Sequence, residues 1–353
     1  MRHTAPFTST GPSVSSRRSS SRRWRILSAS ATLFAVLVTP GDCEPARLEA
    51  SEEDPYETER RRLQGPSLQA TLLPDESGAW LQGERLHASL ADGRRIEITG
   101  FAGDVVHARA LSRDGVREHG APLRLHPAEL VGMQWTETRC EGDTCTGSRF
   151  RIASAAPDDT ENTMPRHSSN RDSWLYRVER TALPAPGAPG APAAPDTHAW
   201  QDACADEPGG SGMGLFVDGR WGSDGAWYPG GYTFSCARGV IAKCARSWGY
   251  KPWKTLTTDH GRVSLHPLHL ACTRAARADY CGDGTPHTRE GVLIGMSNGH
   301  GLNPRAPRGS VIEAIFDHLG ALRVHDWRIP ALAPACRPAR PASNALDVIE
   351  VWR

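Results

Sequence analysis

The sequence predicts an α+β protein in which β structure dominates, and three observations support this class. Short alternating or apolar runs, separated by Gly and Asp turns, fill the first half of the chain. A helical pattern among further strand-like runs occupies the second half, where most of the cysteines lie. A Pro/Ala-rich segment divides the halves. We therefore expect a barrel-like or sandwich-like β-rich domain, followed by a smaller α+β domain stapled by disulfides.

The composition places limits on the class of partner. The chain has 353 residues, enough for two modest domains, and it is rich in proline (27) and glycine (35). Its net charge is +1, but residues 1–41 hold six arginines and no acid, which leaves 35 basic against 40 acidic residues elsewhere. Only three lysines occur, at 243, 251 and 254, which we ascribe to genome composition. A weakly acidic body argues against nucleic acid as a partner.

The N-terminus carries the features of an export signal, which we assign to residues 1–42. An Arg- and Ser-rich stretch precedes a mostly apolar run of thirteen residues, 26–38, which is too short to span a bilayer comfortably. Cys43 then stands where a bacterial lipoprotein carries its lipid, although Asp42 occupies a position that normally holds a small residue. Ordinary cleavage near Gly41 is an equal alternative. We expect an extracytoplasmic location (periplasm, outer-membrane surface or secreted), with membrane attachment only through that lipid.

A charged segment, residues 43–62, is expected to be a disordered tether. The β-rich domain then covers residues 63–182, with turns predicted at Asp92-Gly93 and Gly103-Asp104. Its predicted strands are 84–90, 94–101, 104–111, 130–138, 148–153 and 173–180.

Residues 183–199 form the predicted Pro/Ala linker, a semi-stiff spacer that ends the first domain. The second domain, 200–353, contains seven of the eleven tryptophans. In the predicted helix 265–278, the small and apolar residues fall on one face, while Arg274 and Arg277 are expected to face away from it. The other predicted elements are a helix at 238–247 and strands at 214–221, 226–236, 292–296, 311–317 and 321–327.

Removing Cys43 leaves an even number of cysteines, which in an exported chain predicts four disulfide bridges. No CxxC pair is present to indicate a zinc site. Connectivity cannot be fixed from sequence, but spacing favours local partners. The favoured pairs are Cys140–Cys145, Cys236–Cys244 and Cys272–Cys281, which leaves Cys204 and Cys336 to close the domain.

The run Ala278-Asp279-Tyr280-Cys281, followed by a Gly-Asp-Gly turn, resembles the signature of the ADYC domain. The segments 236–253 and 272–288 are similar to the same family, and the resemblance covers roughly residues 214–327. It implies an exported protein of the kind found in myxobacteria and their relatives, with a β-rich region ahead of the signature. The resemblance implies no established activity.

Within the signature we expect structural roles. Asp279 should accept hydrogen bonds from the amides of the following turn, and Tyr280 should be anchored by its ring with its hydroxyl hydrogen-bonded.

Ser297 lies in Gly295-Met296-Ser297-Asn298-Gly299, which fits the GxSxG pattern of serine hydrolases. The helix that should follow the serine is absent from the sequence pattern, because glycines and prolines come next. Asp317 and His325 are the conceivable partners. A Gly-rich loop is the simpler interpretation.

Residues 279–290 match part of a calcium-binding EF-hand loop, with Asp279, Asp283 and Glu290 as candidate ligands. Cys281 occupies a ligand position, however, and no exiting helix is predicted. A second conceivable site is a histidine cluster, which lacks the carboxylate that usually completes such a set. Its members would be His266, His269, His287 and His300.

We assign no catalytic residue and no cofactor. The preferred function is a non-enzymatic binding or structural module of the cell envelope with a protein or glycan partner. The alternatives are a secreted hydrolase, using Ser297 or a metal, and a weak calcium-binding module. An enzyme should show a deep pocket with convergent acids and histidines, whereas a binding module should show an exposed apolar patch.

Overall fold

The computed structural model describes eleven segments of the chain, which lie between residues 82 and 352. The leader, the tether, Cys43 and the linker residues 184–198 lie outside the described residues, as do the side chains of Cys140, Cys145 and Cys336. Among the described helices, none has the length and apolar character needed to cross a membrane. The described segments are 82–111, 120–141, 144–159, 170–183, 199–205, 212–222, 224–258, 261–288, 294–303, 308–327 and 348–352.

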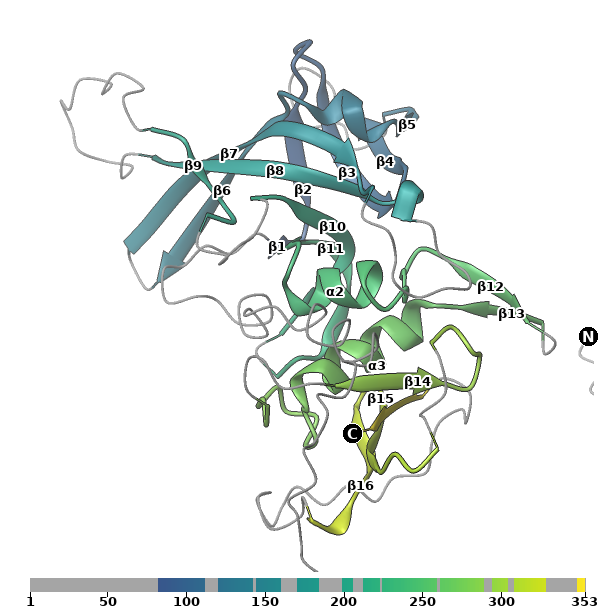
Figure 1. Cartoon of the computed structure of the whole chain (residues 1–353). Coiled ribbons are helices and arrows are strands. Elements are labelled where there is room, and N and C mark those ends of the chain that lie inside the picture. The colour runs from purple at the N-terminus through teal and green to yellow at the C-terminus, as the bar shows by residue number, and fades with distance from the viewer. Residues whose placement is uncertain are drawn as a thin grey trace, which may run out of the picture. The chain divides into compact units, whose positions relative to one another are not determined.

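An eleven-stranded antiparallel sheet forms the larger part of the fold (Figure 1), in the order β1-β11-β10-β8-β7-β6-β2-β3-β4-β5 with β9 beside β8. Buried and solvent-facing residues alternate along β2 and β4, as the sequence pattern predicts. The strands are β1 (Gln82–Gly83), β2 (Leu86–Ser89), β3 (Arg95–Ala102), β4 (Val105–Ala110), β5 (Pro122–Leu125), β6 (Gln134–Glu141), β7 (Thr144–Pro157), β8 (Trp174–Leu183), β9 (Gln201–Asp202), β10 (Gly214–Trp221) and β11 (Trp227–Cys236).

The sheet curls, but among the described strands its two edges do not pair to close a barrel. As a result of the curl, β3 packs over β10 although the two strands are not neighbours in the strand order. The rings of Phe101 and Phe216 stack with centroids 4.6 Å apart. Asp218 accepts a 2.6 Å hydrogen bond from the Phe101 amide, and burial raises the pKa of this carboxyl. The hydrophobic side chains inside the curl, Trp135, Tyr176 and Phe234 among them, make one of the two cores.

The large sheet runs through both predicted domains. Strand β8 precedes the Pro/Ala segment and pairs with β10, which follows it, while β1 pairs with β11. Two ion pairs cross the same boundary: Arg246 binds Asp158 at 2.6 Å, and Lys251 binds Asp172 at 2.5 Å. Independent folding of the two domains stays a prediction, but their strands share one sheet.

In the described part of the chain, helices α2 (Val240–Arg246) and α3 (His266–Arg277) and two smaller sheets complete the fold (Figure 1). These helices confirm the two predicted helices. A hairpin of β12 (Thr255–Thr258) and β13 (Gly261–Ser264) connects them. The small antiparallel sheet has the order β14-β17-β15-β16 and packs on α3. Its strands are β14 (Gly295–Asn298), β15 (Ile312–Asp317), β16 (Gly320–Val324) and β17 (Ile349–Trp352).

The predicted orientation of the arginines on α3 is wrong. Arg274 and Arg277 are both buried, so α3 is enclosed on almost every side rather than presenting a charged face to water. The reason is that polar acceptors after the helix, described below, bind both guanidinium groups inside the fold.

Two disulfides join described cysteines, and neither is a predicted pair. Cys204 bonds Cys236 and so ties the chain after the linker to the end of β11. Cys244 bonds Cys272 and clamps α2 to α3. The predicted pairs Cys236–Cys244, Cys272–Cys281 and Cys204–Cys336 are therefore wrong, because pairing follows contacts between elements and not spacing along the chain. Cys281 is also disulfide-bonded.

Disulfide mapping by mass spectrometry of the unreduced, digested protein should recover peptides that join Cys204 to Cys236 and Cys244 to Cys272. These bridges close loops of 32 and 28 residues, so each should contribute roughly 3–4 kcal/mol to stability. Recovery of Cys236–Cys244 or Cys272–Cys281 peptides from protein that was never reduced would contradict this connectivity.

Candidate functional site

The signature begins where α3 ends. Ala278 has a φ of +51°, the one positive value at a described non-glycine residue, and it turns the chain back across the helix end. Its amide donates to the Ala275 carbonyl, and the Asp279 amide donates to the Arg274 carbonyl, each at 3.0 Å. This pair of bonds is the Schellman arrangement, which here uses alanine where glycine is usual. The reversal places Asp279 against the buried side of its own helix.

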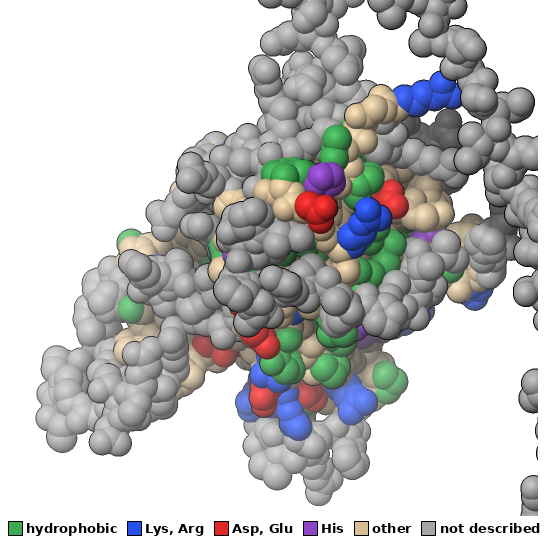
Figure 2. Space-filling view, turned by 90° about the horizontal axis from the view of Figure 1, so that it is seen from below, with side chains coloured by type: hydrophobic (Ala, Val, Ile, Leu, Met, Phe, Trp, Pro, Cys, Tyr) green, Lys and Arg blue, Asp and Glu red, His purple; other side chains and the backbone are tan. Residues whose placement is uncertain are grey.

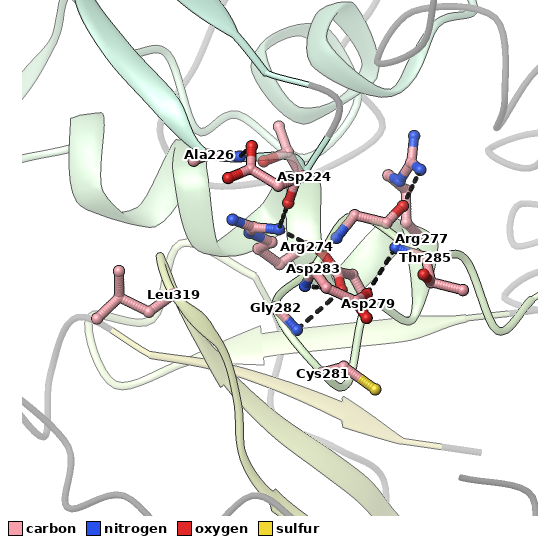
Figure 3. Close-up of polar contacts among 12 residues, drawn as sticks. Asp224, Ala226, Arg274, Arg277, Asp279, Cys281, Gly282, Asp283, Thr285 and Leu319 are labelled. Carbon is pink, nitrogen blue, oxygen red and sulfur yellow. Dashed lines mark hydrogen bonds and ion pairs between the residues drawn. The ribbon is translucent and has the colours of Figure 1, made fainter. Parts of the chain in front are cut away.

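The carboxylate of Asp279 is fully buried and surrounded by donors (Figure 3). One oxygen accepts the amides of Gly282 at 2.9 Å and Asp283 at 3.2 Å. The other accepts the Gly284 amide at 3.1 Å and the Nη1 of Arg274. These are the bonds to the turn amides that the sequence predicted for Asp279, and charge-assisted bonds of this kind are about twice as strong as neutral ones.

The two arginines of α3 complete this network. Arg274 Nη1 also donates to the carbonyl of Asp224 at 2.6 Å, which joins α3 to the loop before β11. Arg277 donates through Nη2 to the Gly284 carbonyl. Burial lowers the pKa of Arg277, and the nearby charge of Asp279 partly offsets this. The first residue of the turn 282–284 is thus bound to Asp279, and the last is bound to both Asp279 and Arg277.

Tyr280 connects the signature to the small sheet. Its hydroxyl donates to Glu313 of β15, and its ring stacks on Phe316 of the same strand with centroids 5.7 Å apart. Its carbonyl accepts the Ala321 amide of β16 at 3.3 Å. Both predicted features of Tyr280, the anchored ring and the bonded hydroxyl, are therefore confirmed.

Gly282 is required by the same contact between the signature and the small sheet. A Cβ at this position would lie 2.0 Å from the Leu319 carbonyl oxygen, and its φ is +71°. Only glycine lets the turn approach the β15–β16 connection this closely.

The model of the ADYC domain matches residues 127–330 of the chain. The chain belongs to the ADYC domain family. The match begins at Pro127, earlier than the resemblance in the sequence indicated, so the ADYC region takes in β6–β8 of the large sheet as well as the signature. No curated protein and no solved structure gives a significant match.

In this ADYC protein the calcium candidates are engaged in other contacts. Both oxygens of Asp279 face hydrogen-bond donors, which repel a cation. Asp283 accepts the Thr285 amide at 2.9 Å, a bond that lowers the pKa of its carboxyl. Glu290 lies outside the described residues. No three described His, Cys, Asp or Glu side chains lie close enough together to hold a metal ion.

Ser297 lies within a strand and not on a strand-to-helix turn. It is buried in β14, which pairs with β17, and its hydroxyl donates to Glu350 of that strand at 3.2 Å. The proposed partner Asp317 accepts the amide of Leu319 at 2.8 Å and so caps the β15–β16 turn. The geometry of a nucleophile elbow is therefore not present at Ser297.

The histidines of α3 make separate contacts. His269 is fully buried, with Nδ1 2.8 Å from the Tyr250 carbonyl, and burial lowers its pKa to about 3. Its Nδ1 must therefore carry the proton in the neutral ring. His266 packs edge-on against Trp227 at 4.4 Å. Further along the chain, His287 lies beside the Tyr280 ring and has Nε2 3.8 Å from Cys281 Sγ.

Two cavities of the described part lie away from the signature. One, of about 520 Å³, opens on the large sheet beside His87, Arg95 and Arg149. The other, of about 540 Å³, lies where the chain after α2 meets the large-sheet part of the fold, beside Lys251 and Lys254. Sequence reasoning missed both, because their walls come from segments far apart in the chain.

Replacing Asp279 with Asn should destabilise the protein by about 3 kcal/mol, because it leaves the buried guanidinium of Arg274 without a counter-charge. The measurement is urea unfolding followed by circular dichroism. Asp283→Asn is the matched control, since this carboxyl lies four residues further along the same turn but is exposed; its effect should stay within about 0.5 kcal/mol. Equal stability of the Asp279→Asn protein and the wild type would show that the ion pair does not support the fold.

Proposed function

We propose that this ADYC protein is an exported, non-enzymatic module of the cell envelope that binds a partner protein through the β15–β16 hairpin. The basic and apolar leader of the sequence supports export, and the two disulfides are compatible with a compartment outside the cytosol. The observation that carries the proposal is a concentration of exposed apolar side chains on one element.

Five large hydrophobic side chains are exposed among the described residues, and three of them belong to or flank this hairpin. Val311 precedes β15, Leu319 lies in the turn and Trp327 follows β16, with exposed fractions of 48%, 52% and 45%. Scattered single exposures are normal in soluble proteins, whereas contiguous apolar patches are typical of interaction surfaces. Val311 and Trp327 flank the open end of the hairpin and Leu319 lies at its turn. Trp is also among the residues that most often dominate binding energy at interfaces.

The surroundings of the hairpin fit a protein partner. Arg323, His325 and Asp326 are exposed along the same element and would supply a polar rim. Figure 2 shows hydrophobic side chains interspersed with acidic, basic and histidine side chains on the face seen from below. This mixture, with no dominant charge sign, suits a protein surface better than a polyanion.

The signature explains why such a surface would be pre-organised. Tyr280 binds Glu313 and Ala321, one residue on each strand of the hairpin, and Gly282 packs on the turn between them. A rigid element loses less conformational entropy on binding than a mobile one. In this proposal, the ADYC residues therefore act through the hairpin and do not contact the partner.

The test is capture from envelope extract on the immobilised mature protein. The double variant Leu319→Ser with Trp327→Ser should retain at most about one tenth of the partner that the wild type retains, because it removes the exposed apolar contacts. The control, Val131→Ser with Tyr228→Ser, removes the two large hydrophobic side chains that are exposed outside the hairpin among the described residues, and it should bind like the wild type. Unchanged melting temperatures would show that both variants fold.

Two results would refute the proposal: equal capture by the hairpin variant and the wild type, or no specific partner for the wild type itself.

A further inference from the structure

The cavity beside Lys251 and Lys254 combines a charged mouth with an apolar interior. Exposed Asp104 and Arg171 lie at its edge with the half-exposed Lys254, while Leu265 and Leu302 are buried at its back. The walls come from the turn between β3 and β4, from the 3₁₀ helix η2 (Asn170–Asp172), from the chain after α2 and from the residue before α3. Its volume of about 540 Å³ is within the range typical of small-molecule sites.

Basic side chains outnumber acidic ones among the described residues that line this cavity. The carboxylate of Asp172 forms ion pairs with the ammonium groups of two lysines. One is Lys251, at 2.5 Å, and the other is Lys254. Arg171 and Asp104 add one base and one acid to the described lining, and Arg171 has a further contact of its own. Hydrogen bonds from the lysines outweigh the effect of burial and lower the pKa of Asp172, so its carboxylate stays ionised. Each ammonium has three donors, and Lys254 can therefore bind a further acceptor while it keeps Asp172.

The identity of these bases is itself informative. The chain has three lysines among its 41 basic residues, and all three lie within twelve positions. Two of them line this one cavity. The lysine ammonium is a compact point charge with three donors, in contrast to the planar guanidinium of arginine.

We propose that this cavity binds a small amphipathic acid, with a carboxylate or phosphate group on a short apolar chain. The acidic group would bind Lys254, which is half-exposed and shares the single carboxylate of Asp172 with Lys251. The apolar chain would pack against Leu256, Leu265 and Leu302. Lys251 is buried and bound to Asp172, so its role is to hold Asp172, and through it Lys254, in position.

Isothermal titration calorimetry of the full mature protein tests whether the cavity binds such an acid. Octanoate is the probe, and 1-octanol and acetate are the comparison ligands, which lack the acidic group and the apolar chain respectively. Octanoate should bind at least about tenfold more tightly than either, because only octanoate uses both the charged mouth and the apolar interior. Lys254→Gln should weaken octanoate binding by about tenfold, since a hydrogen bond to a charged group is lost. Arg262→Gln, an exposed position on the adjoining β13, is the control and should leave the affinity unchanged.

Each alternative outcome is decisive. No octanoate binding, equal affinity for 1-octanol, or full affinity in the Lys254→Gln protein would overturn the proposal. Binding to phosphatidylglycerol vesicles without binding of monomeric octanoate would also overturn it, because it would assign the basic residues to a membrane surface. The cavity shares no residue with the β15–β16 hairpin, so failure here leaves the proposed partner surface untouched.

Discussion

A buried charge must be paired, and this constraint on Asp279 organises the C-terminal half of the protein. The carboxylate lies out of contact with water and collects three amides and one guanidinium, so every acceptor position is used. The left-handed Ala278 brings it there, the turn 282–284 closes around it, and Gly282 can then approach the β15–β16 connection. The signature thus connects elements of the fold. Asp279 neutralises the charge of Arg274, and Tyr280 holds the β15–β16 hairpin through Glu313 and Ala321.

The ADYC region is larger than its signature suggests. The family match starts at Pro127, and the structure gives a physical reason, because β6–β8 belong to the same sheet as β10 and β11. The pairs Arg246–Asp158 and Lys251–Asp172 attach the helical part to this sheet, and the Cys204–Cys236 bridge fixes the chain where it re-enters the sheet. The cavity proposed to bind an acid lies at this junction, and the hairpin proposed to bind a protein lies at the small sheet.

Local patterns predicted much of this fold. The Asp92-Gly93 turn, the two helices and most strands follow from periodicity and turn chemistry within a few residues. The bracing role of Asp279 was also predictable, because its partners lie three to five residues ahead. The orientation of Arg274 and Arg277 was not, since burial of a charge depends on acceptors such as the Asp224 carbonyl, fifty residues away. The sequence analysis also did not predict the observed disulfide pairs or strand β17. Both depend on contacts between residues that are far apart in the sequence.

The most direct test of the central claim is residue-resolved amide hydrogen exchange of the protein at Gly282, Asp283 and Gly284. If the Asp279 carboxylate holds these three amides, they should exchange only through unfolding of the surrounding structure, with protection close to that of the core strands. Exchange of these amides at the rate of an unstructured peptide would show that the carboxylate does not hold the turn, and the account of the signature would be wrong.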